Sequence, residues 1–329
     1  MKNCECDTPG YCKFFNKEMG ENPPHWKWCQ NANESERIHY KTVCDLKHKS
    51  ENTNKNPPSS GEIVNLVDPV CFNDELPTKT NKVAVCVIAA NEYAEKQLNI
   101  TRPTIVKYAN KVNADYIELT GDQFPKYPMF NKYRLSKVLH AYDCVLYLDC
   151  DVVIRDNCPN LFETFNKKIA YFVDEWSIMK NHNSELYNGM NGQRKQILNV
   201  FPHLKDQDRD MEPNGGVMLI HKEVAHRYHQ PSRPYPKIWC FDQDYFLLNL
   251  QKEEYSVIDW RYNLEFVDYD FWSKLESSYI IHLNGSRPTS YRLELLHRMV
   301  DENFEFFPQP KKSPNEPAFL NFRPLWRNS

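Results

Sequence analysis

The chain has 329 residues, of which 41 are Lys or Arg and 44 are Asp or Glu, giving a net charge of −3. This balance excludes a chain-wide positive field of the kind that attracts nucleic acid. The longest apolar run, residues 83–90, is far shorter than the roughly 20 residues that span a bilayer, and the N-terminus lacks the apolar core of a secretory signal. We therefore expect a soluble, cytoplasmic protein that binds no nucleic acid and has no membrane span.

Residues 1–60 are predicted to form a small cysteine-rich module and a polar linker. Five of the eleven cysteines lie in this stretch: Cys4, Cys6, Cys12, Cys29 and Cys44. Pro and Gly interrupt the stretch and aliphatic residues are scarce, so a metal could replace a missing core. A tetrahedral Zn²⁺ site could use four of these cysteines, or three together with one of the histidines His25, His39 and His48. Structural zinc, free thiols and disulfides all stay open.

The main domain is predicted over residues 61–300, followed by a C-terminal tail at 301–329. Its first strand is the apolar run 82–91, followed by a polar helical stretch to about residue 113 and a second strand at 114–120. This β-α-β rhythm predicts an α/β fold with a mainly parallel sheet flanked by helices. Cys86 and Cys144 lie within or beside apolar strand patterns and are expected to behave as small hydrophobic residues.

An amphipathic helix is predicted at residues 131–140. Its apolar residues fall on one face, and the basic side chains Lys132, Arg134 and Lys137 lie elsewhere. Further along the chain, residues 161–172 resume an ordinary α/β pattern. Residues 174–211 are polar and rich in Asn, with flexible backbone indicated at 188–192. We expect this region to be an irregular loop that recognises an acceptor.

A strand in the stretch 145–154 runs directly into Asp149, and a second carboxylate, Asp151, follows two positions later. Side chains two apart on an extended segment share one face, so these carboxylates can converge. At the exit of a parallel strand they would face the crevice where open α/β sheets bind ligands. Hard oxygen ligands suit Mg²⁺ or Mn²⁺, whose other positions are filled by water and phosphate oxygens. The pattern predicts a metal-dependent diphosphate site, although Asp-Cys-Asp can also simply end a strand.

Further polar motifs follow in the C-terminal half. Asn214-Gly-Gly216 precedes an apolar run, where glycines would let a sugar approach the backbone and Asn offers donor and acceptor groups; an ordinary turn is the alternative. Asp242-Gln243 opens a helical stretch, where Asp242 could also be a cap. His282 ends an apolar strand, as a metal ligand or as a core histidine.

Together these motifs resemble glycosyltransferases of the GT-A fold, particularly the retaining family 8 enzymes that include glycogenin and lipopolysaccharide galactosyltransferases. The resemblance covers roughly residues 82–290: the DxD motif at 149–151, an Asn-x-Gly-Val-Met-like segment from Asn214, and Asp-Gln-Asp at 242–244. Residues 279–288 resemble His-x-x-Gly-x-x-Lys-Pro-Trp. Here Gly285 keeps its spacing, whereas Arg287 comes one residue early and no Lys-Pro-Trp follows.

The resemblance implies a GT-A, Rossmann-like sheet and a role for each matching residue. The exit of the first strand would carry the nucleotide's base and ribose, at Ala89, Ala90 and Asn91. Other contacts to the donor would come from Lys132 or Arg134, Asn214, Gly216, Asn263, Gly285 and Arg287. The metal ligands would be Asp149, Asp151 and His282. The catalytic residues would be Asp242, which contacts the sugars, and Gln243, which lies near the anomeric carbon.

The resulting hypothesis is a retaining, Mn²⁺- or Mg²⁺-dependent glycosyltransferase that moves a hexose from a nucleotide diphosphate sugar, most simply a UDP-sugar, to a saccharide or other hydroxyl acceptor. One alternative is a sugar-phosphate nucleotidyltransferase, which would need a Gly-rich, basic loop after the first strand. The chain has Ala-Ala-Asn-Glu-Tyr at that place. Another is a non-catalytic carbohydrate-binding protein, which rests only on the aromatic content of 13%.

Overall fold

The computed structural model describes residues 74–124, 128–165, 169–176, 184–207, 211–231, 241–268, 270–284 and 289–301, with the short segments 11–12, 17–18, 63–64 and 235–236. The chain divides into two units, residues 1–59 with 328–329 and residues 60–327. In the first unit, strands β1 (Tyr11–Cys12) and β2 (Lys17–Glu18) pair antiparallel. The thiols of the predicted zinc module and the tail beyond residue 301 lie outside the description, as do Gly285 and Arg287.

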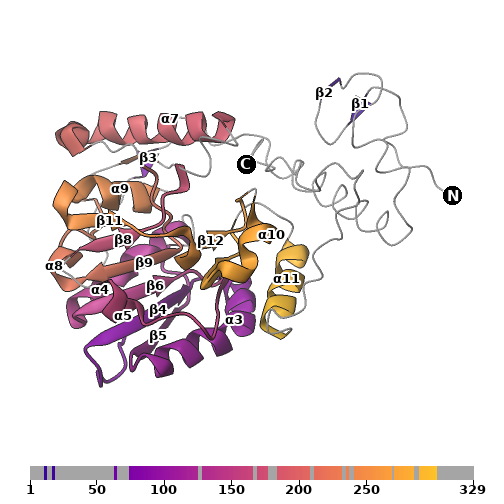
Figure 1. Cartoon of the computed structure of the whole chain (residues 1–329). Helices are drawn as coiled ribbons and strands as arrows, with labels where there is room; N and C mark the ends of the chain where they lie inside the picture. Colours follow the sequence, from indigo (N-terminus) through magenta and orange to yellow (C-terminus); the bar gives the residue numbers. More distant parts are fainter. Residues whose placement is uncertain are drawn as a thin grey trace. The chain divides into compact units, whose positions relative to one another are not determined.

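The second unit is built on a six-stranded sheet with the order β11-β8-β9-β6-β4-β5 (Figure 1). All of these strands except β9 run in the same direction. The prediction of a mainly parallel α/β sheet flanked by helices is therefore confirmed. The strands are β4 (Val83–Ala89), β5 (Asp115–Thr120), β6 (Cys144–Leu148), β8 (Ala170–Phe172), β9 (Val217–His221) and β11 (Tyr255–Val257).

Strand β4 is buried on both faces of this sheet. Alternate residues from Ala84 to Ala89 belong to two different core clusters. One cluster includes side chains of α4 (Leu135–Ala141) and α9 (Phe241–Asn249), and the other includes side chains of α3 (Glu92–Lys111). Burial on both sides explains why the strand is continuously apolar. Cys86 and Cys144 are buried in these clusters, as predicted.

A second, three-stranded sheet has the order β12-β13-β7. Its strands are β7 (Val152–Ile154), β12 (Leu264–Glu265) and β13 (Ile280–His282). Residues 145–154 therefore form two strands, since β6 lies in the large sheet and β7 in the small one. The Asp-Cys-Asp segment is the crossing between the two sheets. Helices α10 (Phe271–Lys274) and α11 (Thr289–Asp301) contribute side chains to the core beside the small sheet.

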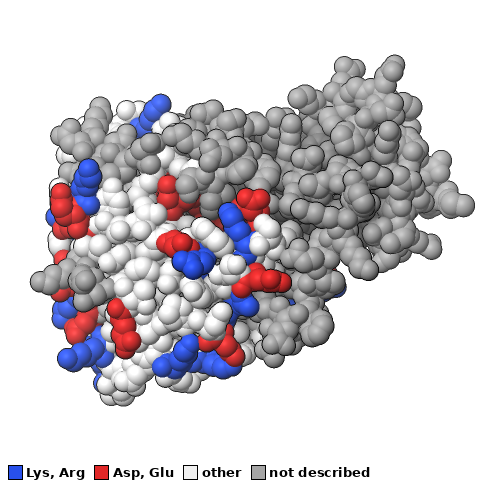
Figure 2. Space-filling model, in the orientation of Figure 1, with Lys and Arg blue, Asp and Glu red and all other residues white. Residues whose placement is uncertain are grey.

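The remaining described elements are short except for α7. They are β3 (Ile63–Val64), β10 (Tyr235–Pro236), α5 (Leu161–Thr164), α7 (Ser184–Val200), α8 (Lys222–Ala225), and the 3-10 helices η1 (Pro128–Arg134), η2 (Pro202–Gln207), η3 (Lys252–Glu254), η4 (Trp260–Tyr262) and η5 (Leu275–Ser277). Among the helices in the described part, none is both long and apolar enough to cross a membrane. On the face in Figure 2, acidic and basic side chains lie side by side.

The helix predicted at 131–140 is shorter than expected. The 3-10 helix η1 runs to Arg134, and the α-helix begins at Leu135. The 3-10 turn packs aromatic rings, because the Phe130 ring lies 6.3 Å from that of Phe241 and 6.0 Å from that of Tyr133. Aromatic packing of this kind outweighs local helix propensity.

The expectation of an irregular loop over 174–211 was wrong for its central part, which forms α7. Glycine costs about 1 kcal/mol in a helix relative to Ala. Tertiary contacts offset that cost, because Ile197 and Leu198 enter the core and Arg194 forms buried ion pairs with Glu212 and Asp244. No local pattern in the sequence reveals these partners.

Asp115, at the start of β5, is hydrogen-bonded to the residues that precede β4. Its carboxylate accepts hydrogen bonds from the backbone N–H of Thr80 at 2.9 Å and of Asn81 at 3.1 Å, and from the Tyr142 hydroxyl at 3.0 Å. Burial alone would raise the pKa of this carboxyl group. The hydrogen bonds from Thr80 and Asn81 outweigh burial and hold the pKa of Asp115 well below its usual range.

Asp115→Asn should destabilise the protein by about 2 kcal/mol at pH 7, because charged hydrogen bonds are lost. The depressed pKa means that the ionised folded form gains stability above the unfolded pKa of about 3.9 and loses it as the pH falls below that value. The difference between variant and wild type in urea unfolding should therefore shrink from pH 7 to pH 3. Asp143→Asn, at an exposed carboxylate, is the control. A difference that does not change with pH would contradict this account.

Candidate functional site

Polar residues from both sheets meet at one edge of the large sheet. The parallel strands β4, β6 and β8 end at this edge, whereas the antiparallel β9 begins there, with Val217 opposite Leu148. This topology places the Asn214-Gly-Gly216 turn beside Asp149. The small sheet meets the same place, since His282 at the end of β13 lies opposite Val152 at the start of β7.

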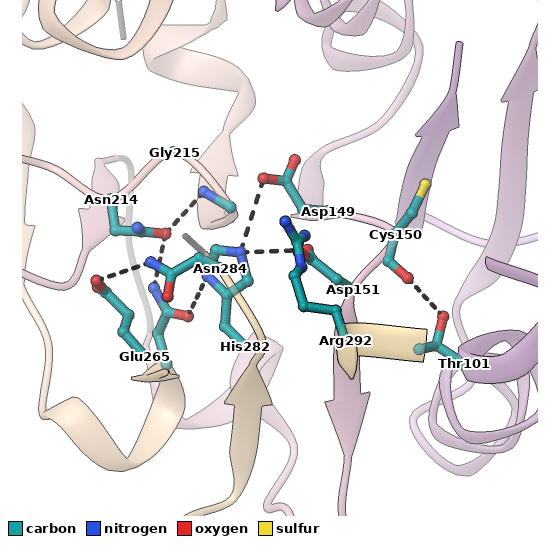
Figure 3. A network of polar contacts seen from close by, with 12 residues as sticks. Thr101, Asp149, Cys150, Asp151, Asn214, Gly215, Glu265, His282, Asn284 and Arg292 are labelled. Atoms are coloured by element: carbon teal, nitrogen blue, oxygen red, sulfur yellow. Dashed lines mark hydrogen bonds and ion pairs between the residues drawn. The ribbon is translucent and has the colours of Figure 1, made fainter. Parts of the chain in front are cut away.

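Asp149, Asp151 and His282 form a cluster with the geometry of a metal site (Figure 3). One ligand atom from each residue lies within 4.8 Å of the other two. The His282 Nε2 atom is 3.8 Å from Asp149 Oδ2 and 3.3 Å from Asp151 Oδ1. Backbone hydrogen bonds hold these segments, because the Asp149 N–H donates to the Gly216 carbonyl at 2.8 Å and the Leu283 N–H to the Asp151 carbonyl at 3.0 Å. The structure thus brings together the three predicted ligands.

The tautomer of His282 follows from a chain of hydrogen bonds that begins at the backbone. The Gly216 N–H can only donate, so the atom of Asn214 that lies 2.8 Å away is its oxygen. The Asn263 amide must then donate to that oxygen, also at 2.8 Å, and turn its own oxygen toward His282 Nδ1 at 3.2 Å. Nδ1 therefore carries a proton, and Nε2 is the ring nitrogen that faces the two carboxylates. A neutral imidazole and two carboxylates suit Mn²⁺ or Mg²⁺.

Gly216 is packed so closely that no side chain fits. A Cβ atom added there would lie 2.1 Å from His282 Cε1, 2.7 Å from His282 Nε2 and 2.9 Å from Asp149 Oδ2. A Cβ on Gly215 would lie 2.6 Å from Gln243 Oε1. The need for glycine at 215 and 216 thus comes from close approach to the candidate ligands and to Gln243.

Among the described residues, two cations contact the aspartates. Lys132 Nζ lies 3.1 Å from Asp149 Oδ1 and donates to the Gly215 carbonyl at 3.1 Å. The Arg292 guanidinium, from α11, forms an ion pair with Asp151 Oδ2. Lys132 was a predicted donor contact, whereas the sequence analysis missed Arg292, because nothing in its local sequence marks it.

Arg134, the other cation predicted to contact the donor, is placed elsewhere. Its side chain is fully buried, where the guanidinium pairs with Asp74 and donates to the carbonyls of Thr120 at 2.8 Å and Gly121 at 2.6 Å. These contacts hold the segment before β4 against the end of β5. The prediction of a donor contact at Arg134 is therefore corrected to a structural role. The sequence did not reveal this role, because Asp74 is 60 positions away.

Asp242 and Gln243 lie in the first turn of α9, beside the Asn-Gly-Gly turn. Gln243 Oε1 accepts from the Gly215 N–H at 2.8 Å, and its amide donates to Glu212 at 3.3 Å. Asp242 is only 3% exposed, and its Oδ2 atom is buried without a hydrogen-bond partner in the described structure. Burial raises the pKa of Asp242, Lys132 opposes this shift, and Asp149 adds to it. The helix begins at Phe241, so Asp242 is not its cap.

Asp244 belongs to a buried ion-pair cluster that the sequence analysis did not anticipate. The Arg194 Nε atom donates to Asp244 Oδ1 at 2.9 Å, and another guanidinium nitrogen lies 2.6 Å from Glu212 Oε2. Burial and the nearby Asp244 raise the pKa of Glu212 well above its usual value, although Arg194 opposes the shift. This cluster ties α7 and the start of α9 to the segment before β9.

The residues predicted to carry the base and ribose lie at the same edge of the sheet, from the last residue of β4 onward. Ala89 and Ala90 are buried, and Asn91 is exposed. The Asn91 side chain caps α3 by accepting a hydrogen bond from the Ala94 N–H at 3.0 Å. Core packing and helix capping thus account for these three residues locally, and their nucleotide role stays a prediction.

No protein-family model matches the chain, and no curated protein matches it. Solved structures that match part of the chain include a glycosyltransferase involved in the glycosylation of the major capsid of PBCV-1, at 13% identity and a TM-score of 0.43, over 65% of this chain and 98% of that one. The apo structure of the bifunctional glycosyltransferase WbbM matches at 10% identity and a TM-score of 0.44, over 70% and 52%. The glycosyltransferase GlyE of Streptococcus pneumoniae TIGR4 matches at 15% identity and a TM-score of 0.38, over 65% and 61%. The chain spans less than two thirds of the length of the last two.

Gly216→Ala should weaken Mn²⁺ binding at least tenfold, about 1.4 kcal/mol, because the new Cβ displaces His282 or Asp149. Electron paramagnetic resonance of free Mn²⁺ would measure the affinity. Gly192→Ala is the matched control, since a Cβ there meets nothing within 4 Å. Equal affinities in the two variants would contradict the close packing of the site.

Asn263→Ala should weaken Mn²⁺ binding by about 10- to 100-fold, as is typical when the hydrogen-bond partner of a ligand histidine is lost. Asn249→Ala, which removes an amide hydrogen bond within α9, is the control. Metal affinity and melting temperature should be measured on both variants. A lowered melting temperature with unchanged Mn²⁺ affinity would show that Asn263 supports the fold only.

Proposed function

We propose that this protein is a metal-dependent glycosyltransferase that moves a hexose from a nucleotide diphosphate sugar to a hydroxyl acceptor. The observation that carries the proposal is the convergence of Asp149, Asp151 and the Nε2 atom of His282 at the edge where the sheet strands end. Open α/β sheets bind nucleotides at such an edge. The choice of a UDP-sugar and of a retained anomeric configuration rests on the motif resemblance described above.

Mn²⁺ held by these three residues would act as a Lewis acid that stabilises negative charge on the departing diphosphate. The chain's own cations add to this effect. The Lys132 ammonium sits beside Asp149 and is held by the Gly215 carbonyl, so it offers positive charge next to the candidate metal ligands. Because these groups are fixed before the reaction, they need little rearrangement as charge develops.

The sugar would lie against the Asn-Gly-Gly turn and the first turn of α9. Asp242 presents a buried oxygen without a partner, and buried acceptors of this kind are normally satisfied. A sugar hydroxyl is a donor that fits an acceptor-only carboxylate. Gln243 is held against the same turn by hydrogen bonds with the Gly215 N–H and Glu212, which supports a role for this residue beside the sugar.

The local structure gives less support to the nucleotidyltransferase alternative. After β4 the chain enters α3 directly, with Asn91 as a side-chain cap. A triphosphate-binding loop would instead need several free backbone N–H groups and a basic side chain at this point. A carbohydrate-binding protein without activity would not need the Asp149, Asp151 and His282 arrangement.

The direct test is incubation of the protein with a panel of nucleotide sugars and Mn²⁺, with measurement of released nucleoside diphosphate. Release should require the metal and should fall at least 100-fold in Asp151→Asn, whereas Asp143→Asn, an exposed control, should match the wild type. Pyrophosphate release from a nucleoside triphosphate and a sugar phosphate would favour the nucleotidyltransferase. Sugar binding without any turnover would favour the binding protein.

The same incubation tests retention of configuration. With an α-linked donor and an accepted hydroxyl compound, proton NMR should show an α-linked product. A β-linked product would reject retention and leave glycosyl transfer intact.

A further inference from the structure

In the part of the chain that the structure describes, each candidate metal-binding aspartate is paired with one cation. Lys132, from η1, pairs with Asp149, and Arg292, from α11, pairs with Asp151. The cations reach the site from two different parts of the fold, and the two pairs balance the charge of the two carboxylates. A divalent metal binding to the same carboxylates must therefore compete with these cations.

Arg292 is placed between the candidate metal site and the end of β4. Its guanidinium carbon lies 5.5 Å from the centre of the Tyr93 ring, in the first turn of α3, and its side chain is 13% exposed. The ring and the carboxylate of Asp151 thus hold one guanidinium at the edge of the site. The planar guanidinium fork can bind either a carboxylate or a phosphate through two parallel hydrogen bonds.

The atoms of Asp151 show how this competition would work. One carboxylate oxygen, Oδ2, contacts Arg292, and the other, Oδ1, lies 3.3 Å from His282 Nε2, where the metal would bind. A divalent ion on this carboxylate would neutralise much of the charge that attracts Arg292 and would repel the guanidinium. A diphosphate on the same ion would offer Arg292 a new anionic partner.

We propose that Arg292 is a ligand for the donor's diphosphate and that its ion pair with Asp151 weakens metal binding until the diphosphate arrives. This inference rests on the proposed function. It predicts that metal and nucleotide bind cooperatively, since metal alone must displace Arg292, whereas metal with diphosphate gives the guanidinium another partner. It also assigns a diphosphate contact to α11, which begins two residues after the motif-predicted Arg287 in the sequence.

The test is the pair of variants Arg292→Gln and Arg298→Gln. Arg298 lies on the same helix but is exposed and pairs with Glu294, so its loss removes the same charge away from the site. Arg292→Gln should bind Mn²⁺ alone at least threefold more tightly than the wild type, because a competitor is gone. At saturating Mn²⁺ the same variant should bind UDP at least tenfold more weakly. Arg298→Gln should match the wild type in both measurements.

Electron paramagnetic resonance can measure Mn²⁺ binding, and calorimetry can measure UDP binding at saturating metal. Unchanged or weaker Mn²⁺ affinity in Arg292→Gln would overturn the inference, and so would unchanged UDP affinity. Arg292→Lys keeps the charge and should bind Mn²⁺ alone as the wild type does; tightening in this variant would also overturn it. If the wild type binds neither Mn²⁺ nor UDP, the proposed function itself fails. If it binds both and Arg292→Gln behaves like Arg298→Gln, only the role of Arg292 fails.

Discussion

The hydrogen bond from the Gly216 N–H to Asn214 Oδ1 determines the arrangement of the rest of the site. A backbone N–H can only donate, so this contact orients the Asn214 amide, and that amide orients Asn263. Asn263 in turn accepts from His282 Nδ1, which leaves Nε2 facing the aspartates. The Asn214 amide also donates to Glu175 at 2.7 Å, so this series of hydrogen bonds is held at Glu175 as well as at His282. The missing Cβ at Gly216 is part of the same constraint, because a side chain there would occupy the space of His282.

The topology explains why these residues can meet although they are far apart in sequence. A fully parallel sheet would place the start of β9 at the opposite edge from Asp149. The single antiparallel strand instead brings the Asn-Gly-Gly turn to the edge where β4 and β6 end. The crossing from β6 to β7 then carries Asp151 into the small sheet, where β13 presents His282. The site therefore lies at the junction of the two sheets, and its shape depends on both.

Much of the fold and the candidate metal cluster could be predicted from the sequence, because both leave local patterns. Continuous apolar runs predict strands buried on two faces. Asp149 and Asp151 lie close together as predicted, but they do so in the turn between β6 and β7 and not on one extended strand. Arg134 and α7 were misjudged for a different reason: their partners, Asp74 in one case and Glu212 with Asp244 in the other, are distant in sequence. Arg292 was missed because only the packing of α11 brings it to Asp151. Such contacts leave no periodicity in the chain.

Two buried carboxylate oxygens in and near the site lower the stability of the folded protein. An unsatisfied buried acceptor costs about 1–3 kcal/mol, and Asp242 Oδ2 and Glu265 Oε1 are both buried without hydrogen-bond partners among the described residues. Burial, with Glu175 nearby, raises the pKa of Glu265 well above its usual value, so protonation can relieve part of its cost. Burial also raises the pKa of Asp242, although the positive charge of Lys132 opposes the shift. Under the proposed function, a sugar hydroxyl that donated to Asp242 Oδ2 would satisfy this acceptor, so the cost of burying it would be offset when the donor binds.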